Sequence, residues 1–160
     1  MKKSVALLVL AILLSFAGCD SSAPAVQEDG FTFTYNGYQI HLNTDAAPVL
    51  TALGEPKGCT EETSCAFDDL DKTYYYGSFY LSTYSLEEKD YVYSIWFVDD
   101  SVSTEEGIRI GCTQAEVEAV YCADRFNGSN AYTLTKGDTK LTIILTGGLV
   151  SSVQYEALLE

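Results

Sequence analysis

Positive charge is scarce in this sequence. Nine Lys and Arg residues stand against 23 Asp and Glu residues, which gives a formal net charge of −14 at pH 7. A surface of this sign repels polyanions, so it disfavours binding to nucleic acid or to anionic lipid headgroups. The charge favours solubility or a basic partner.

Motifs typical of catalysis are also lacking. His41 is the only histidine, and it falls on the polar face of an expected hairpin. The sequence has no Gly-x-Ser-x-Gly, Ser-x-x-Lys or Walker pattern, and no Cys-x-x-Cys spacing. Two carboxylate clusters lack the spacing of a calcium loop; they are Asp68, Asp69 and Asp71, and Asp99, Asp100, Glu105 and Glu106. We expect no enzyme activity, cofactor or metal site. An enzyme with paired carboxylates stays an alternative, because such pairs need only meet in space.

Long hydrophobic runs are confined to the N-terminus. Lys2 and Lys3 precede an unbroken apolar run from Val5 to Leu14. The run is shorter than the roughly 20 residues that a membrane-spanning helix needs. A basic start, a short apolar segment and small residues before a cleavage site are typical of a secretory signal peptide.

The segment Phe16-Ala17-Gly18-Cys19 places small residues directly before a cysteine. It resembles the lipobox of bacterial lipoproteins, although that family usually has Leu where this chain has Phe16. The resemblance implies a signal peptide over residues 1–18 and a diacylated (palmitate-bearing) Cys19 as mature N-terminus. Two acyl chains hold a protein stably at a membrane. We therefore expect a lipid-anchored protein of the cell envelope, on the extracytoplasmic side, with residues 19–30 as a flexible tether.

Four further cysteines remain: Cys59, Cys65, Cys112 and Cys122. Outside the cytoplasm they can oxidise, and four thiols allow three pairings. Cys59 and Cys65 flank a short acidic segment and are the disulfide candidates. Cys112 and Cys122 bracket an expected helix of about 15 Å. Bridged Cα atoms lie within about 7 Å, so we do not expect that pair.

A hairpin is predicted next. Residues 31–35 and 38–42 alternate apolar and polar side chains, and Asn36-Gly37 lies between them. Such a pair favours a type I′ turn, which needs positive φ at both central residues. The turn places six side chains on one buried face, in the pairs Tyr35 with Tyr38, Phe33 with Ile40, and Phe31 with Leu42.

The rest of the chain predicts two similar units, each with a short helix followed by three strands. We expect helices over 44–53 and 113–121, the second opened by the capping box Thr113-Gln114-Ala115-Glu116. We expect strands over 73–76, 78–84, 91–98, 108–110, 131–135, 140–145 and 149–155. A shift of 68 residues aligns Val49 with Val117, and a shift of 58 aligns Tyr91 with Leu149.

These units define the expected fold class. It is α+β, with two tandem helix-plus-antiparallel-meander repeats preceded by a β-hairpin and with the helices on one side of the sheet. Repeat 1 covers residues 31–103 and contains the hairpin, and repeat 2 covers residues 104–160.

Short motifs at the helices resemble a known superfamily. Leu53-Gly54-Glu55-Pro56 ends the first helix, and Ile110-Gly111-Cys112-Thr113 leads to Val117 and Tyr121 in the second. Over residues 40–158 these resemble the β-lactamase-inhibitor-protein superfamily, which includes the SmpA/OmlA (BamE-like) lipoproteins. This chain departs from the pattern at Cys122, where a Gly is expected. The resemblance implies a sheet face that binds another protein, and no catalysis.

Alternation along the strands assigns the sheet faces. We expect an inward group and an outward group. The inward group is Phe79, Leu81, Tyr91, Tyr93, Ile95, Phe97, Leu149, Val153 and Tyr155. The outward group is Tyr75, Tyr80, Ser82, Tyr84, Val92, Ser94 and Trp96, with Thr133, Thr135, Thr142 and Ile144 at comparable places in the second unit.

The aromatic members of the outward group are the candidate binding site: Tyr75, Tyr80, Tyr84 and Trp96. Tyr and Trp dominate interface hot spots because they give large contact area with few rotatable bonds. The sequence therefore predicts a protein-binding module, either inhibitor-like or an envelope-assembly lipoprotein. The alternative is a surface lipoprotein that binds a small ligand or a glycan, since the same rings also stack on sugars.

Overall fold

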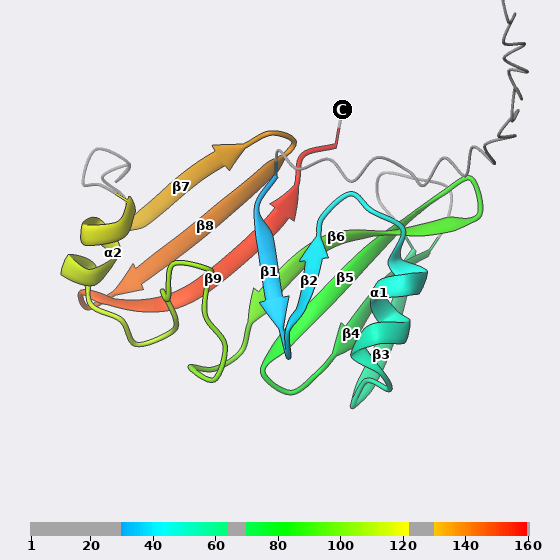
Figure 1. The fold of residues 1–160 in the computed structure, drawn as a ribbon, viewed down its shortest axis with the longest axis horizontal. Coiled ribbons are helices and arrows are strands. Elements are labelled where there is room, and N and C mark those ends of the chain that lie inside the picture. Colours follow the sequence, from blue (N-terminus) through cyan, green and yellow to red (C-terminus); the bar gives the residue numbers. More distant parts are fainter. Residues whose placement is uncertain (1–29, 64–69, 122–129, 160) are drawn as a thin grey trace, which may run out of the picture.

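The computed structural model describes residues 30–63, 70–121 and 130–159. These segments form a two-stranded and a seven-stranded antiparallel sheet with two short helices (Figure 1). In chain order the elements are β1 (Thr32–Tyr35), β2 (Tyr38–His41), α1 (Ala46–Leu53), β3 (Gly58–Thr63), β4 (Leu70–Tyr75), β5 (Phe79–Leu86), β6 (Lys89–Phe97), α2 (Gln114–Tyr121), β7 (Ala131–Lys136), β8 (Thr139–Thr146) and β9 (Leu149–Ala157).

The expected α+β fold of two helix-plus-meander repeats is wrong. Strands make up 53% of the described residues, and each described helix has only eight residues. The two halves also differ in their elements. Residues 58–63 form the strand β3, which was not predicted, whereas Ile108, Arg109 and Ile110 form no strand. The fold is mostly β because seven strands join into one large sheet, which two short helices cannot cover.

The N-terminal hairpin confirms the predicted turn. Asn36 and Gly37 have φ values of 50° and 81°, and Tyr35 pairs with Tyr38. The ladder ends at the pair of Thr32 and His41, so the expected pair of Phe31 with Leu42 lies beyond it. Tyr38 is 36% exposed rather than buried, because it lies at the tip of the hairpin.

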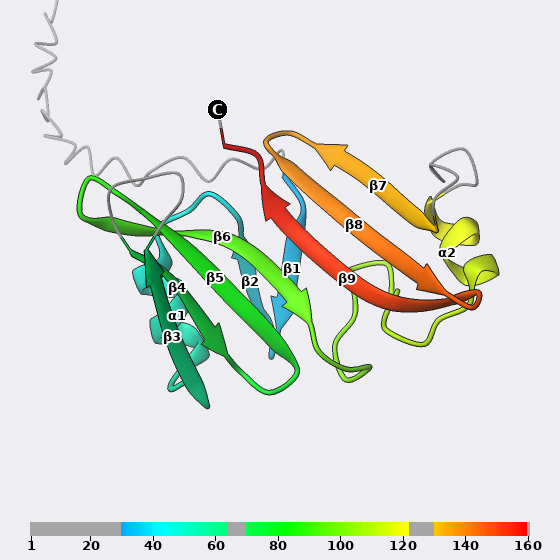
Figure 2. The same cartoon turned by 180° about the vertical axis from the view of Figure 1, so that it is seen from behind.

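The large sheet has the strand order β3-β4-β5-β6-β9-β8-β7 (Figure 2). Two runs of consecutive strands, β3 to β6 and β7 to β9, meet where β6 pairs with β9. Only three residue pairs form this central seam: Ser94 with Glu156, Ile95 with Tyr155, and Trp96 with Gln154. Each strand within a run pairs with its neighbour over at least four residues.

A β-bulge interrupts each run near the seam. In the β5–β6 ladder Ser82 pairs with Ser94 and Thr83 with Val92, which leaves Tyr93 unpaired. In the β8–β9 ladder Ile144 pairs with Ser152 and Leu145 with Val150, which leaves Ser151 unpaired. An extra residue on one strand shifts the phase of side-chain alternation.

The bulges explain why part of the face assignment was wrong. Val92, expected outside, is fully buried, and Leu149, expected in the core, is 48% exposed. Tyr91 pairs with Tyr84 on the outer face, and the hydroxyl of Tyr93 bonds to Glu156 on that face. Beyond the bulges the assignment is confirmed, since the core contains Ile95, Phe97, Val153 and Tyr155.

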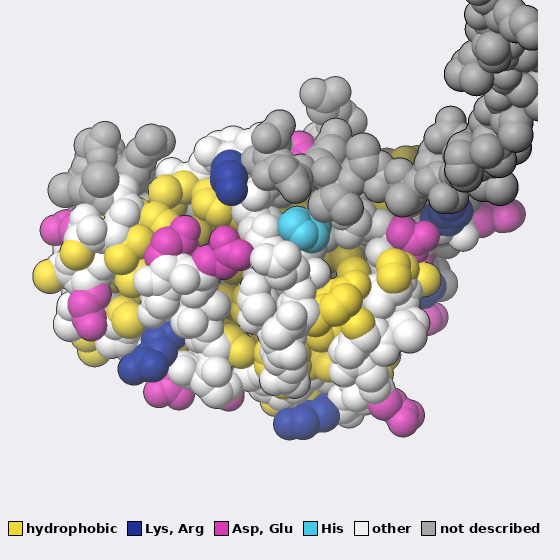
Figure 3. All heavy atoms as spheres, viewed as in Figure 1, with side chains coloured by type: hydrophobic (Ala, Val, Ile, Leu, Met, Phe, Trp, Pro, Cys, Tyr) yellow, Lys and Arg dark blue, Asp and Glu magenta, His cyan; other side chains and the backbone are white. Residues whose placement is uncertain are grey.

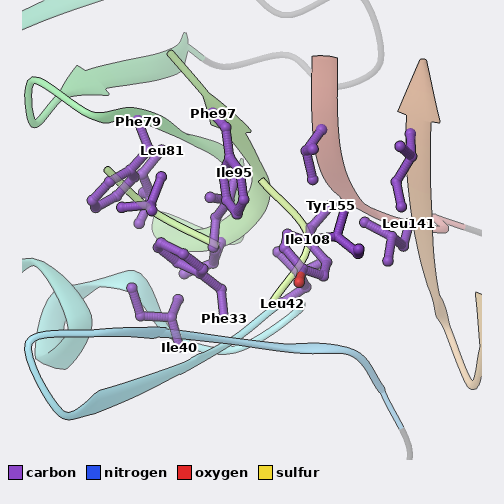
Figure 4. Packing of buried hydrophobic residues seen from close by; sticks show 14 of the residues in the cluster. Phe33, Ile40, Leu42, Phe79, Leu81, Ile95, Phe97, Ile108, Leu141 and Tyr155 are labelled. Carbon is purple, nitrogen blue, oxygen red and sulfur yellow. The ribbon is translucent and has the colours of Figure 1, made fainter. Parts of the chain in front are cut away.

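The core lies between the large sheet and the elements that cover one of its faces. The hairpin carries Phe33, which packs on Phe79 of β5 and Phe97 of β6 at ring-centroid distances of 5.1 and 5.3 Å. Ile40 and Leu42 point toward the same cluster (Figure 4). Burial of a side chain such as Phe33 contributes about 2 kcal/mol. This packing fixes the hairpin across the middle of the sheet.

Both helices lie on the same side as the hairpin (Figure 1). Asp45 caps α1 by accepting a bond from the amide of Ala47, at 2.9 Å. The predicted capping box of α2 is confirmed, since Glu116 accepts a bond from the amide of Thr113, at 2.7 Å, and Thr113 Oγ1 accepts one from the amide of Glu116. Within the described residues, neither helix has the length and apolar character needed to cross a membrane.

Candidate binding face

One face of the large sheet is left uncovered by the described elements (Figure 2). The hairpin β1–β2, both helices and the connector that carries Val102 and Ile108 all pack on the opposite face. Figure 3 looks onto that covered side, where carboxylates and polar groups separate the hydrophobic areas. Among the side chains of this face, Trp96, Ile144 and Leu149 are exposed.

Three aromatic side chains form a row across neighbouring strands of this face. Tyr75 of β4 pairs with Tyr80 of β5, and Tyr80 pairs with Trp96 of β6. Their ring centroids lie 4.9 and 6.1 Å apart, with interplanar angles of 33° and 37°. Trp96 is 51% exposed and donates a hydrogen bond from Nε1 to Ser152 Oγ, at 3.0 Å. This bond fixes the indole against β9.

Exposed aliphatic side chains lie on the same face as the row. Ile144 of β8 is 41% exposed and Leu149 of β9 is 48% exposed, and register places both on the uncovered face. Val98, two residues after Trp96, is 40% exposed. We call this set the apolar patch: Tyr75, Tyr80, Trp96, Val98, Ile144 and Leu149. Large exposed apolar areas usually mark contact surfaces.

Sequence reasoning missed two members of the apolar patch. Leu149 was expected in the core, because the bulge at Ser151 leaves no signal in an alternating sequence. Val98 follows the last residue of β6 and was not singled out. The available signal for Val98 was alternation, because it lies two residues after Trp96 in the expected strand over 91–98.

Tyr84, the fourth predicted site residue, does not join the apolar patch. Its ring stacks on Tyr91 at 5.5 Å, and the residue is only 8% exposed. Its hydroxyl donates to Asn43 Oδ1, at 2.7 Å, and Asn43 in turn donates to Asp138. Burial, then the nearby Tyr91, raises the pKa of Tyr84. These contacts make Tyr84 a packing residue rather than an accessible one.

Polar side chains form the next row on the same face. The hydroxyls of Thr73 and Ser82 lie 3.0 Å apart, and Lys140 forms an ion pair of 2.7 Å with Glu156. Tyr93 donates to Glu156 as well. Burial acts to raise the pKa of Glu156, but the bonds from Lys140 and Tyr93 bring it below its ordinary value. Glu156 therefore stays anionic and paired.

Carboxylates border the apolar patch at the end of β6. Asp99 and Asp100 directly follow Val98, and both are exposed. Asp99 accepts hydrogen bonds from the hydroxyl of Ser101 and from its amide, the second at 2.9 Å. These bonds, from the hydroxyl first and the amide second, lower the pKa of Asp99. The border of the patch is thus negatively charged at neutral pH.

The remaining candidate residues do not assemble into a reactive site in the part of the chain that the structure describes. His41 lies on the hairpin, where Nδ1 is 3.4 Å from Thr32 Oγ1. Across residues 30–63, 70–121 and 130–159, no group of three or more His, Cys, Asp or Glu side chains could hold a metal ion. Cys59 is exposed on β3. Cys19, Cys65, Cys122, Asp68 and Asp69 lie outside the described residues, as do the predicted signal peptide (residues 1–18) and most of the expected tether (residues 19–30).

Comparison with protein-family models, with curated proteins and with solved structures finds no match to this chain. The resemblance to the β-lactamase-inhibitor-protein superfamily therefore stays a prediction.

Proposed function

We propose that this chain is a lipid-anchored, extracytoplasmic protein-binding module that holds its partner on the uncovered sheet face. One observation carries the proposal. Trp96, the only tryptophan of the chain, is 51% exposed and lies beside Tyr80 in the apolar patch. Exposed Trp and Tyr at the centre of an apolar area are typical of binding hot spots. The anchor rests on the resemblance of Phe16-Ala17-Gly18-Cys19 to a lipobox.

Ring geometry favours a protein partner over a glycan. A sugar stacks on the flat face of a free aromatic ring. Tyr80, however, has a ring neighbour on each side, with centroids at 4.9 and 6.1 Å. Tyr75 and Tyr80 therefore lie against each other, which leaves less of each ring face free. Edges and partial faces of this kind suit the irregular apolar contacts of a protein interface.

The test is a pull-down from host envelope and secreted extracts with residues 20–160, which contain every described strand and helix. A Tyr80→Ala/Trp96→Ala variant serves beside it, with circular dichroism as the check of folding. The matched control is Tyr38→Ala/Val120→Ala, because these residues are 36% and 38% exposed on the covered side. We expect one identified protein to bind the parent and the control but not the patch variant. Equal capture by all three would place the binding surface elsewhere, and capture by none would contradict the proposal.

A glycan-binding surface is the second candidate. One observation favours it: Gln154, Thr142 and Thr133 continue the aromatic row across β9, β8 and β7 in the same register. An amide and two hydroxyls in line with the rings could hydrogen-bond the hydroxyls of a sugar chain. The emission of Trp96, measured with a panel of cell-wall saccharides, tests this second candidate function. Unchanged emission with every saccharide would contradict it.

A further inference from the structure

Negative charge adjoins the apolar patch, and no Lys or Arg among the described residues forms an ion pair with it. Asp99 and Asp100 lie two and three residues beyond Phe97, the last residue of β6, and both are exposed. In the described part of the chain the two ion pairs are Lys72 with Asp90 and Lys140 with Glu156, so neither involves this border. The charge of Lys57 adds a smaller lowering of the pKa of Asp99, after the bonds from Ser101.

We propose that the partner is a basic protein surface, whose Arg or Lys side chains reach Asp99 and Asp100 while its apolar groups cover the apolar patch. The inference rests on the proposed function and names the chemistry of the partner. Complementary charge at the rim of an apolar interface core raises the association rate and selects the partner.

The net charge argues against a second copy of this chain as the occupant. Each copy carries a formal charge of −14. Two such surfaces repel each other, and the repulsion is strongest where exposed carboxylates would meet across the interface. The same field draws a basic protein toward the border of the patch.

Trp96 offers a second contact for a cation. It ends the aromatic row, so among the described residues it has one ring neighbour where Tyr80 has two. A guanidinium group over an exposed indole face gains cation–π energy, and Trp is the best ring for this contact. An arginine can therefore lie on Trp96 while a neighbouring basic group pairs with Asp99 or Asp100, three and four residues further along the chain.

Three synthetic peptides test this inference on residues 20–160. Each has twelve residues in which Leu alternates with Arg, with Gln or with Glu. None contains Trp, so the emission of Trp96 reports binding alone. We expect the Arg peptide to change the emission at low salt and the Gln and Glu peptides to bind more weakly or not at all. Added salt should weaken the Arg peptide because screening shortens the reach of the carboxylates.

Two charge variants separate a rim contact from general attraction to an acidic protein. Asp99→Asn/Asp100→Asn removes two charges beside the apolar patch, and Asn can still accept the bonds from Ser101. Glu87→Gln/Glu88→Gln removes two charges at the exposed tip of the β5–β6 hairpin. We expect the first variant to weaken the Arg peptide about fivefold and the second to change its affinity less than about twofold.

Several outcomes overturn the inference. An equal loss of affinity for the Arg peptide in both variants would mean that only the overall negative charge of the protein attracts it. Binding of the Gln peptide as tightly as the Arg peptide would mean that charge does not select the partner. The pull-down can capture a partner that needs Trp96 while the Arg peptide leaves the emission of Trp96 unchanged. In that case the protein-binding function stands, and the proposal that the partner is basic is wrong. A pull-down that captures no protein contradicts the proposed protein-binding function, whatever the result with the peptides.

Discussion

The hydroxyl of Tyr93 donates a 2.7 Å hydrogen bond to Oε1 of Glu156, 63 residues further along the chain. Tyr93 is the bulged residue of β6, and Glu156 belongs to β9. The bulge thus places a side chain where it bonds across the central seam. Burial and the carboxylate of Glu156 together raise the pKa of Tyr93 to about 12.

Replacement of Tyr93 by Phe removes this bond and leaves Glu156 with Lys140 alone. We expect a loss of about 1 kcal/mol in the free energy of unfolding at pH 7. A raised pKa in the folded state stabilises the fold fully below the unfolded value near 10, and this contribution is lost as the pH rises toward 12. Urea unfolding from pH 8 to 11.5 should therefore bring the parent and the variant closer together. A gap that widens with pH would contradict the assignment.

The ion pair of Lys72 and Asp90 predicts a second pH dependence. Its atoms lie 2.7 Å apart, and Ser85 also donates to Asp90. Burial acts to raise the pKa of Asp90, but the bonds from Lys72 and Ser85 hold it below its ordinary value. A lowered pKa stabilises the fold above about pH 4, and this contribution is lost as the pH falls through the folded value.

Asp90→Asn should therefore destabilise the protein by about 1 kcal/mol at pH 7 and by less at pH 2 to 3. Thermal unfolding of parent and variant across this range measures the difference. Glu88→Gln, an exposed site in the adjacent turn, is the control and should follow the parent at every pH. A constant gap between Asp90→Asn and the parent would show that the pair does not titrate with folding.

The bulge at Ser151 predicts opposite behaviour for two adjacent residues. Leu149 is 48% exposed, whereas Val150 is 2% exposed. Leu149→Ala should change the free energy of unfolding by no more than about 0.5 kcal/mol. Val150→Ala should cost about 2 kcal/mol, because it opens a gap in a packed core. Equilibrium denaturation of both variants measures the order, and the reverse order would mean that β9 keeps a regular alternation.

Trp96 should matter little to stability if it serves binding. Trp96→Ala removes an exposed ring and one hydrogen bond to Ser152, so we expect a loss of about 1 kcal/mol or less. Phe33→Ala removes a core ring in contact with Phe79 and Phe97 and should cost about 3 to 5 kcal/mol. Similar losses in the two variants would assign Trp96 to the framework of the sheet rather than to its binding surface.

Local features of the fold could be predicted from the sequence because they depend on neighbours in the chain. Asn36 and Gly37 favour their turn by backbone conformation alone, and Thr113 and Glu116 form their capping box within four residues. The outward position of Trp96 also followed from alternation beyond the bulge.

The bulges, β3 and the fold class could not be predicted, because each depends on pairing across the sheet. Whether Tyr93 is paired or extruded is decided by the register of β5, not by the sequence around it. The edge strand β3 has residues 58–62 exposed, so it lacks the alternation that marks a half-buried strand. For Tyr84, alternation gave the correct face, but its stacking on Tyr91 and its bond to Asn43 decide that it is buried.

The three-pair seam between β6 and β9 gives the sheet a mechanical weak line through its centre. A partner that contacts Trp96 on one side and Ile144 or Leu149 on the other spans this line. Its binding restricts the motion of the two runs of strands relative to each other. Binding should then slow amide hydrogen exchange at Ser94 and Trp96 more than at the outer strands. Slower exchange at these two amides would therefore show that a partner occupies the apolar patch.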